Sequence, residues 1–93
     1  MRYEWDPAKR AWTLRERGID FVDAIRIFDG AVLQFSRWPQ SYPERRVVAI
    51  GLIEQIELTL VYTPKASDLR RIISARRAKR KEHRFYAEAF EVA

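Results

Sequence analysis

The sequence predicts a single α+β domain in which helices pack on one face of a mainly antiparallel sheet. Apolar residues recur at helical spacing near the N-terminus, and from residue 32 onward they alternate with polar residues as in strands. A basic helical pattern then closes the chain. At 93 residues the protein is long enough for one small core, so we expect one domain over residues 1–93.

Capping and turn-forming residues set the limits of the expected elements. Asp6 and Pro7 form an N-cap followed by proline at the first helical position, and Gly18 is the expected C-terminal stop. Asp20 is a second N-cap. The expected elements are strands over residues 2–5, 32–36, 45–52, 56–62 and 69–76, and helices over residues 7–17, 21–28 and 78–91.

The sequence predicts a loop for one connection between strands and a hairpin of undetermined turn type for another. Residues 37–44 contain two prolines and are expected to form a loop, in which Trp38 and Tyr42 could stack on an unpaired base or on a partner protein. Residues 53–55 join two strands as a hairpin but include neither Gly nor Asn, so the type of turn stays open.

Positive charge is concentrated near the C-terminus. Residues 65–84 contain nine Lys or Arg against Asp68 and Glu82, a net charge of +7 in a chain whose total is +5. Because phosphate contacts supply most of the affinity for nucleic acids, the last strand and the start of the last helix are expected to bind a polyanion. A solvated charged face is the alternative.

Composition excludes several other classes of protein. The chain has no cysteine, which excludes disulfides and thiolate metal sites, and His83 is its single histidine. The N-terminus lacks the apolar run of a signal peptide, and no segment approaches the roughly 18 apolar residues of a membrane span. We therefore expect a cytoplasmic protein with no metal, no other cofactor and no membrane contact.

Strand alternation suggests which basic residues act together. If residues 69–76 form a regular strand, Ser74 and Arg76 share one face, while Arg71 and Arg77 share the other. The face with Ser74 is the less apolar one and is the expected site. The alternative for Arg76 is a structural ion pair with Glu82.

Cleavage of RNA through its own 2′-hydroxyl requires a positioned phosphate and stabilisation of the developing negative charge. Arginine suits both tasks because its planar fork binds phosphate at two points, but it is a poor proton carrier. The candidate proton carriers are Glu82, His83, Tyr62 and Tyr86, and none of them lies in a diagnostic motif.

Taken together, these residues resemble the BrnT family of bacterial toxins, small ribonucleases with a RelE-like fold. The similarity covers almost the whole chain and depends on the order and spacing of several short motifs. They are Trp5-Asp6-Pro7-Ala8-Lys9, Gly18 followed by Phe21 and Ala24, Phe28-Asp29, residues 46–51 and 61–63, and residues 71–78 with Glu82 and Tyr86. Where the family often shows Asn and then Lys-His-Gly, this chain has Thr13 and Glu16-Arg17-Gly18.

The resemblance implies a ribonuclease toxin that cleaves RNA and inhibits translation, acting as a metal-independent endoribonuclease. It also implies a BrnA-like antitoxin that covers the toxin in a hetero-oligomer and binds DNA, so that the toxin meets DNA only indirectly. The implied catalytic residues are Arg46, Arg76, Glu82 and Tyr86, and the implied substrate-binding residues are Arg71, Ser74, Arg77, Arg80 and Tyr62.

Two other functions fit the same sequence. A non-catalytic module that binds RNA or DNA explains the basic charge and needs no proton carrier. A degenerate toxin that acts only through its antitoxin complex fits the missing Lys-His-Gly motif.

Overall fold

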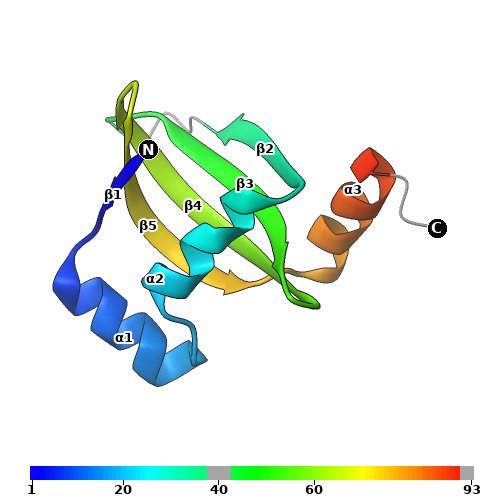
Figure 1. The fold of residues 1–93 in the computed structure, drawn as a ribbon, viewed down its shortest axis with the longest axis horizontal. Coiled ribbons are helices and arrows are strands. Elements are labelled where there is room, and N and C mark those ends of the chain that lie inside the picture. The colour runs from blue at the N-terminus through cyan, green and yellow to red at the C-terminus, as the bar shows by residue number, and fades with distance from the viewer. Residues whose placement is uncertain (38–42, 91–93) are drawn as a thin grey trace.

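A computed structural model describes residues 1–37 and 43–90, and Trp38 and Tyr42 lie outside these residues. The elements follow one another along the chain in nearly the expected order (Figure 1). They are β1 (Arg2–Glu4), α1 (Pro7–Arg17), α2 (Phe21–Ala24), the 3₁₀ helix η1 (Ile25–Asp29), β2 (Val32–Arg37), β3 (Arg46–Ile53), β4 (Ile56–Ala66), β5 (Leu69–Arg77) and α3 (Arg80–Phe90).

The five strands form one sheet in the order β1-β5-β4-β3-β2, and all neighbours are antiparallel except β1 and β5. β1 pairs with a strand that is distant in the sequence, since Arg2 lies opposite Leu69 of β5. β4 runs to Ala66, beyond the expected end at residue 62. Pro64 is tolerated there because it lies past the residues of β4 that pair with β3, where β4 has one strand neighbour fewer.

The expected helix caps are confirmed. The Asp6 carboxylate accepts a hydrogen bond from the Ala8 N–H at 3.0 Å, and the Asp20 carboxylate accepts one from the Val22 N–H at 3.2 Å. Gly18 ends α1 with a φ of 69°, a conformation that favours glycine. Asp20 also receives the Arg10 guanidinium at 2.7 and 3.1 Å, which ties α1 to the start of α2.

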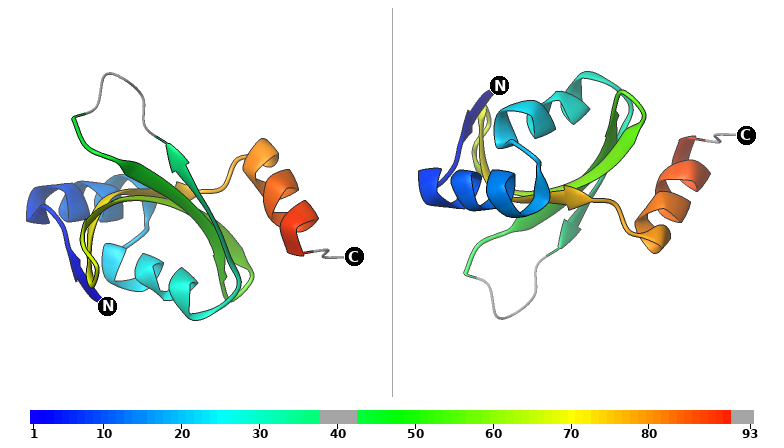
Figure 2. Two further views of the ribbon diagram at one scale, coloured as in Figure 1. Left: turned by 90° about the horizontal axis from the view of Figure 1, so that it is seen from above. Right: turned by 90° about the horizontal axis from the view of Figure 1, so that it is seen from below.

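One face of the sheet is covered by α2 and η1, which lie in the hollow of the curved strands (Figure 2). We call it the covered face. Phe21, Ala24 and Ile27 are fully buried there against strand residues such as Leu60. The contact is close at Gly51, where an added Cβ would lie 2.8 Å from the Ile27 Cβ. Glycine is therefore needed for η1 to approach β3.

α3 lies on the opposite face, outside the hollow of the sheet (Figure 2). The expectation that the helices share one face is therefore wrong. Tyr86 is buried against Val48 and Ile50, whereas its neighbour Phe85 is 40% exposed. α3 covers only one end of this face, and we call the face that carries Val48 and Ile50 the open face. The helix packs here because its N-terminus is fastened to open-face side chains, as described below.

Candidate functional site

A β-bulge brings the basic residues of β5 onto one face. Ser74 pairs with Val61, but Ile72 pairs with Tyr62, so Ile73 is an extra residue in β5. The extra residue resets the alternation, and Arg71, Ser74 and Arg76 all lie on the open face. The expectation that Arg71 and Arg76 lie on opposite faces is wrong, because it assumed a strand without a bulge.

Neighbouring strands add two more arginines to the open face. Val48 packs against Tyr86 on this face, and Arg46 lies two residues before it on β3. Arg37, at the end of β2, pairs with Arg46 and shares its face. The open face therefore collects Arg37, Arg46, Arg71 and Arg76 from three strands, while the covered face is mainly apolar.

A pocket of about 340 Å³ opens beside these residues. Lys9 of α1, Arg37 and Arg46 supply its charged walls. Its remaining lining residues are Val48, Val61, Ile73 and Ser74. Sequence reasoning did not select Lys9 or Arg37 as site residues. Lys9 was visible only as the end of the Trp5–Lys9 motif, and Arg37 carried no signal because its role depends on its pairing with Arg46.

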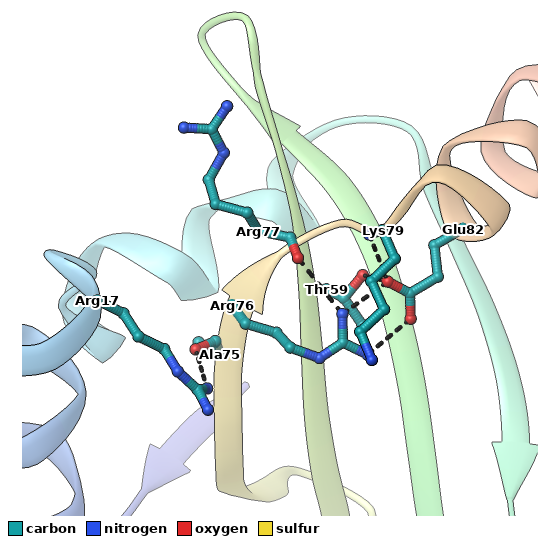
Figure 3. A network of polar contacts seen from close by, with 7 residues as sticks. All are labelled: Arg17, Thr59, Ala75, Arg76, Arg77, Lys79 and Glu82. Carbon is teal, nitrogen blue, oxygen red and sulfur yellow. Dashed lines mark hydrogen bonds and ion pairs between the residues drawn. The ribbon is translucent and has the colours of Figure 1, made fainter.

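Arg76 and Glu82 form the centre of a network that joins β5, β4 and α3 (Figure 3). The Arg76 guanidinium donates to both Glu82 carboxylate oxygens at 2.7 and 2.8 Å. Glu82 also accepts from the Thr59 hydroxyl at 3.0 Å and from the Lys79 N–H at 2.8 Å. The last of these bonds caps the N-terminus of α3.

This network fixes the charge of Glu82. The Arg76 hydrogen bonds, supported by those from Lys79 and Thr59, lower the pKa of Glu82 from 4.5 to about 2 despite partial burial. The same pair raises the pKa of Arg76. Glu82 is therefore a carboxylate at neutral pH, and it holds Arg76 and the start of α3 in place. The ion pair that the sequence offered as an alternative role for Arg76 is present.

α1 closes the outer edge of β5. β1 pairs with β5 only as far as Arg71, and α1 lies against β5 beyond that point. Thr13 and Arg17 follow Lys9 at four-residue intervals and therefore share its side of the helix. Arg17 donates to the Ala75 carbonyl at 3.0 Å (Figure 3). Arg17, at the position where the family often has His, thus supplies a hydrogen-bond donor to a backbone carbonyl at the edge of β5.

Three residues predicted to bind substrate lie away from the open-face cluster. Tyr62 is buried on the covered face, where its hydroxyl donates to Gln34 at 2.7 Å. Arg77 pairs with Leu58, a covered-face residue, and its side chain diverges from that of Arg76 (Figure 3). Arg80 begins α3 and is exposed.

Two candidate proton carriers, Tyr86 and His83, lie on α3 and contact residues of neighbouring elements. The Tyr86 hydroxyl donates to the Ala31 carbonyl at 2.9 Å, and burial raises the pKa of Tyr86. His83 lies 2.9 Å from a Glu57 carboxylate oxygen. Both side chains fasten α3 to neighbouring elements, so neither points into the pocket lined by Lys9 and Arg46.

Within residues 1–37 and 43–90, no group of His, Cys, Asp or Glu side chains is arranged to hold a metal ion. No helix in this part of the chain combines the length and apolar character of a membrane span.

The open face is thus a basic sheet surface that a helix covers at one end and that contains a pocket lined by cations, features typical of proteins that attract polyanions. Residues 5–82 match the family model described as the ribonuclease toxin BrnT of type II toxin–antitoxin systems. This match covers most of the chain, and the chain belongs to that family.

Comparison with solved structures supports the same assignment. The chain is similar to the crystal structure of the ribonuclease toxin BrnT of Brucella abortus, with 26% sequence identity and a TM-score of 0.62. The alignment covers 86% of this chain and 99% of the Brucella chain. A search of curated proteins found no match. The predicted family and the predicted α+β fold are confirmed.

Proposed function

We propose that this protein is an endoribonuclease toxin that cleaves RNA without a metal ion and thereby inhibits translation. The observation that supports the proposal most strongly is the meeting of Arg46, Arg71, Ser74 and Arg76 on the open face. These side chains offer guanidinium forks and a hydroxyl on a surface that α3 leaves partly uncovered. Such a surface can hold a phosphodiester and stabilise added negative charge on it.

In the proposed reaction the substrate supplies its own nucleophile. The 2′-oxygen forms a bond to phosphorus, the bond to the 5′-oxygen breaks, and a 2′,3′-cyclic phosphate and a 5′-hydroxyl result. The proton lost by the 2′-hydroxyl passes through solvent to the leaving 5′-oxygen. Arg46 stabilises the charge on the phosphate, Arg71 binds the neighbouring backbone, and Ser74 donates a hydrogen bond.

Arg76 is proposed to contact the phosphate from the side of α3, while Glu82 orients its guanidinium. Tyr86 and Glu82 then act as positioning residues, because each is committed to contacts that fix α3. Arg77 and Arg80 contribute only to long-range attraction of RNA in this arrangement.

The proposed partner is a BrnA-like antitoxin that inactivates the toxin in a hetero-oligomer. An acidic segment of such a partner would be attracted to the open face by the same charges that attract RNA. Binding there would block the substrate, and any contact with DNA would be made by the antitoxin. We place the complex in the cytoplasm, where its RNA targets are found.

The test is incubation of the purified protein with end-labelled RNA in the presence of EDTA. Cleavage is expected, and Arg46→Ala is expected to reduce its rate by about 100-fold, the typical cost of losing one charge-stabilising donor. Arg26→Ala is the matched control, because Arg26 is exposed on η1 at the covered side. Circular dichroism confirms that both variants are folded.

Growth of bacteria that express the protein without its antitoxin gives a second readout. Arrest that is reversed by Arg46→Ala or by the antitoxin supports the proposal. RNA that is retarded in a gel but never shortened contradicts it and favours a binding module. Tight antitoxin binding with neither RNA cleavage nor growth arrest favours a degenerate toxin.

A further inference from the structure

The open-face pocket contains two kinds of surface, and the proposed function accounts for only one of them. Its walls carry the cations Lys9, Arg37 and Arg46, contributed by α1, β2 and β3. Its floor is apolar and is formed by the side chains of Val48, Val61 and Ile73. Phosphate recognition explains the charged walls, but it gives no reason for an apolar floor.

The floor is a consequence of the bulge in β5. At a bulge, two successive residues oppose one residue of the neighbouring strand, and here Ile73 and Ser74 both line the pocket beside Val61. In a regular strand Ile73 and Ser74 would lie on opposite faces of the sheet. The extra residue instead gives the open face an aliphatic side chain next to a hydroxyl and three cations.

A nucleotide matches this combination better than a phosphate alone. The flat face of a base has apolar character, while its sugar and phosphates are polar and anionic. The pocket volume of about 340 Å³ is close to the lower end of the range of roughly 300–1,000 Å³ that is typical of small-ligand sites. The space suits one nucleotide and is too small for a base pair.

We propose that this pocket binds one unpaired nucleotide of single-stranded RNA. The base lies on Val48, Val61 and Ile73, and Lys9 and Arg37 hold the flanking phosphates. A base inside a duplex is stacked on both faces and cannot enter without being flipped out. The inference rests on the proposed function for the identity of the nucleic acid, and it adds that cleavage requires an unpaired nucleotide.

Binding is tested with a 2′-O-methyl RNA tetranucleotide, which lacks the attacking hydroxyl, and with a blunt duplex of the same modified RNA. NMR titration is expected to show saturable shifts of the Ile73 and Ser74 amides with the single strand. The single strand is expected to bind at least about tenfold more tightly than the duplex, since a base contact is made only by the former. Equal or tighter binding of the duplex would overturn the inference.

Two pairs of variants separate the pocket from general charge attraction. Lys9→Ala and Arg26→Ala each remove one positive charge, yet only Lys9 lines the pocket. Ile73→Ser and Ile56→Ser leave the charge unchanged, and Ile56 is an exposed residue at the distant start of β4. Lys9→Ala and Ile73→Ser are expected to weaken single-strand binding about tenfold, and the controls less than about threefold.

The outcomes distinguish this inference from the proposed function. If the wild-type protein cleaves RNA while both pocket variants bind and cleave like their controls, the pocket assignment is wrong and the ribonuclease activity stands. If the tetranucleotide shifts Ile73 and Ser74 but RNA is never cleaved, the pocket stands and the activity is wrong. Should Ile73→Ser fail to fold, Lys9→Ala decides alone, because Lys9 is exposed on α1.

Discussion

The two faces of the sheet are built from the same strands but differ in almost every physical property. The covered face buries Phe21, Ile27 and Leu60 completely and is sealed by α2 and η1. The open face carries Arg46 and Arg76 and is covered at one end only. The comparison shows that one face supplies most of the hydrophobic stabilisation of the domain, which frees much of the other to hold like charges close together.

The division is not perfectly clean, because Arg70 packs among aromatic rings on the covered side. Arg70 lies 4.1 Å from the centre of the Phe28 ring and 5.0 Å from that of Tyr62, and it donates to the Tyr3 hydroxyl at 3.1 Å. Aromatic faces attract the guanidinium there. Arg70 therefore contributes to packing on the covered face, in contrast to its neighbour Arg71 on the open face.

The largest expected effect comes from truncating a side chain on the covered face. Leu60→Ala removes a fully buried side chain from the core and is expected to lower the free energy of unfolding by about 2–5 kcal/mol. Val61→Ala alters the next residue, which is only half-buried on the open face, and is expected to cost less than about 1.5 kcal/mol. Urea denaturation measures both, and equal losses would contradict the division of labour between the faces.

A smaller effect is expected at the junction between the open face and α3. Glu82→Gln removes the charge from a group with several hydrogen bonds and is expected to lower stability by about 1–3 kcal/mol at pH 7. Because the pKa of Glu82 falls from 4.5 to about 2 on folding, its charge stabilises the protein fully above pH 4.5. That stabilisation is lost as the pH falls from 4.5 toward 2.

Thermal melts of the wild type and Glu82→Gln across this pH range measure the effect. The difference between them is expected to shrink as the pH drops. Glu88→Gln, at an exposed position of the same helix, controls for the general loss of a negative charge. If the difference in melting temperature between wild type and Glu82→Gln stays constant down to pH 2, the network does not stabilise the charged form of Glu82.

The smallest expected effect distinguishes two arginines that the sequence treats alike. Arg71→Ala is expected to slow RNA cleavage about tenfold, since one charged contact to phosphate is typically worth about 1.5–3 kcal/mol and Arg71 also pairs with Glu4. Arg77→Ala is expected to slow it less, because Arg77 leaves β5 from the covered side. Cleavage rates at several salt concentrations measure the difference. A larger loss of rate for Arg77→Ala than for Arg71→Ala would contradict the placement of the site on the open face.

Local chemistry explains which parts of the fold were predictable. Asp6, Gly18 and Asp20 act on their own chain neighbours, so the limits of α1 and the start of α2 could be read directly from the sequence. The place of α3 could not, because it depends on Glu82 finding Arg76 and Thr59 across the sheet. β1 was likewise recognised as a strand, but its partner lies at the other end of the sequence.

The candidate site was predictable in composition but not in arrangement. Arg46, Ser74 and Arg76 were identified from residue type and motif, and the structure places them on one face. The bulge at Ile73 has no sequence signature, since no glycine marks it, and it invalidated the expected alternation. Lys9 enters the site through the packing of α1 against β5, which strand periodicity cannot predict.

The pairing of β1 with β5 also determines when the protein can be completed during its own synthesis. Arg2 is among the first residues made, but its partner Leu69 comes much later in translation. Until β5 has left the ribosome, β4 has β3 as a neighbour but lacks β5. Arg71, Ser74 and Arg76 are therefore not yet arranged on the sheet. A nascent chain therefore cannot present the open-face arginines until the whole of β5 is available to pair with β4.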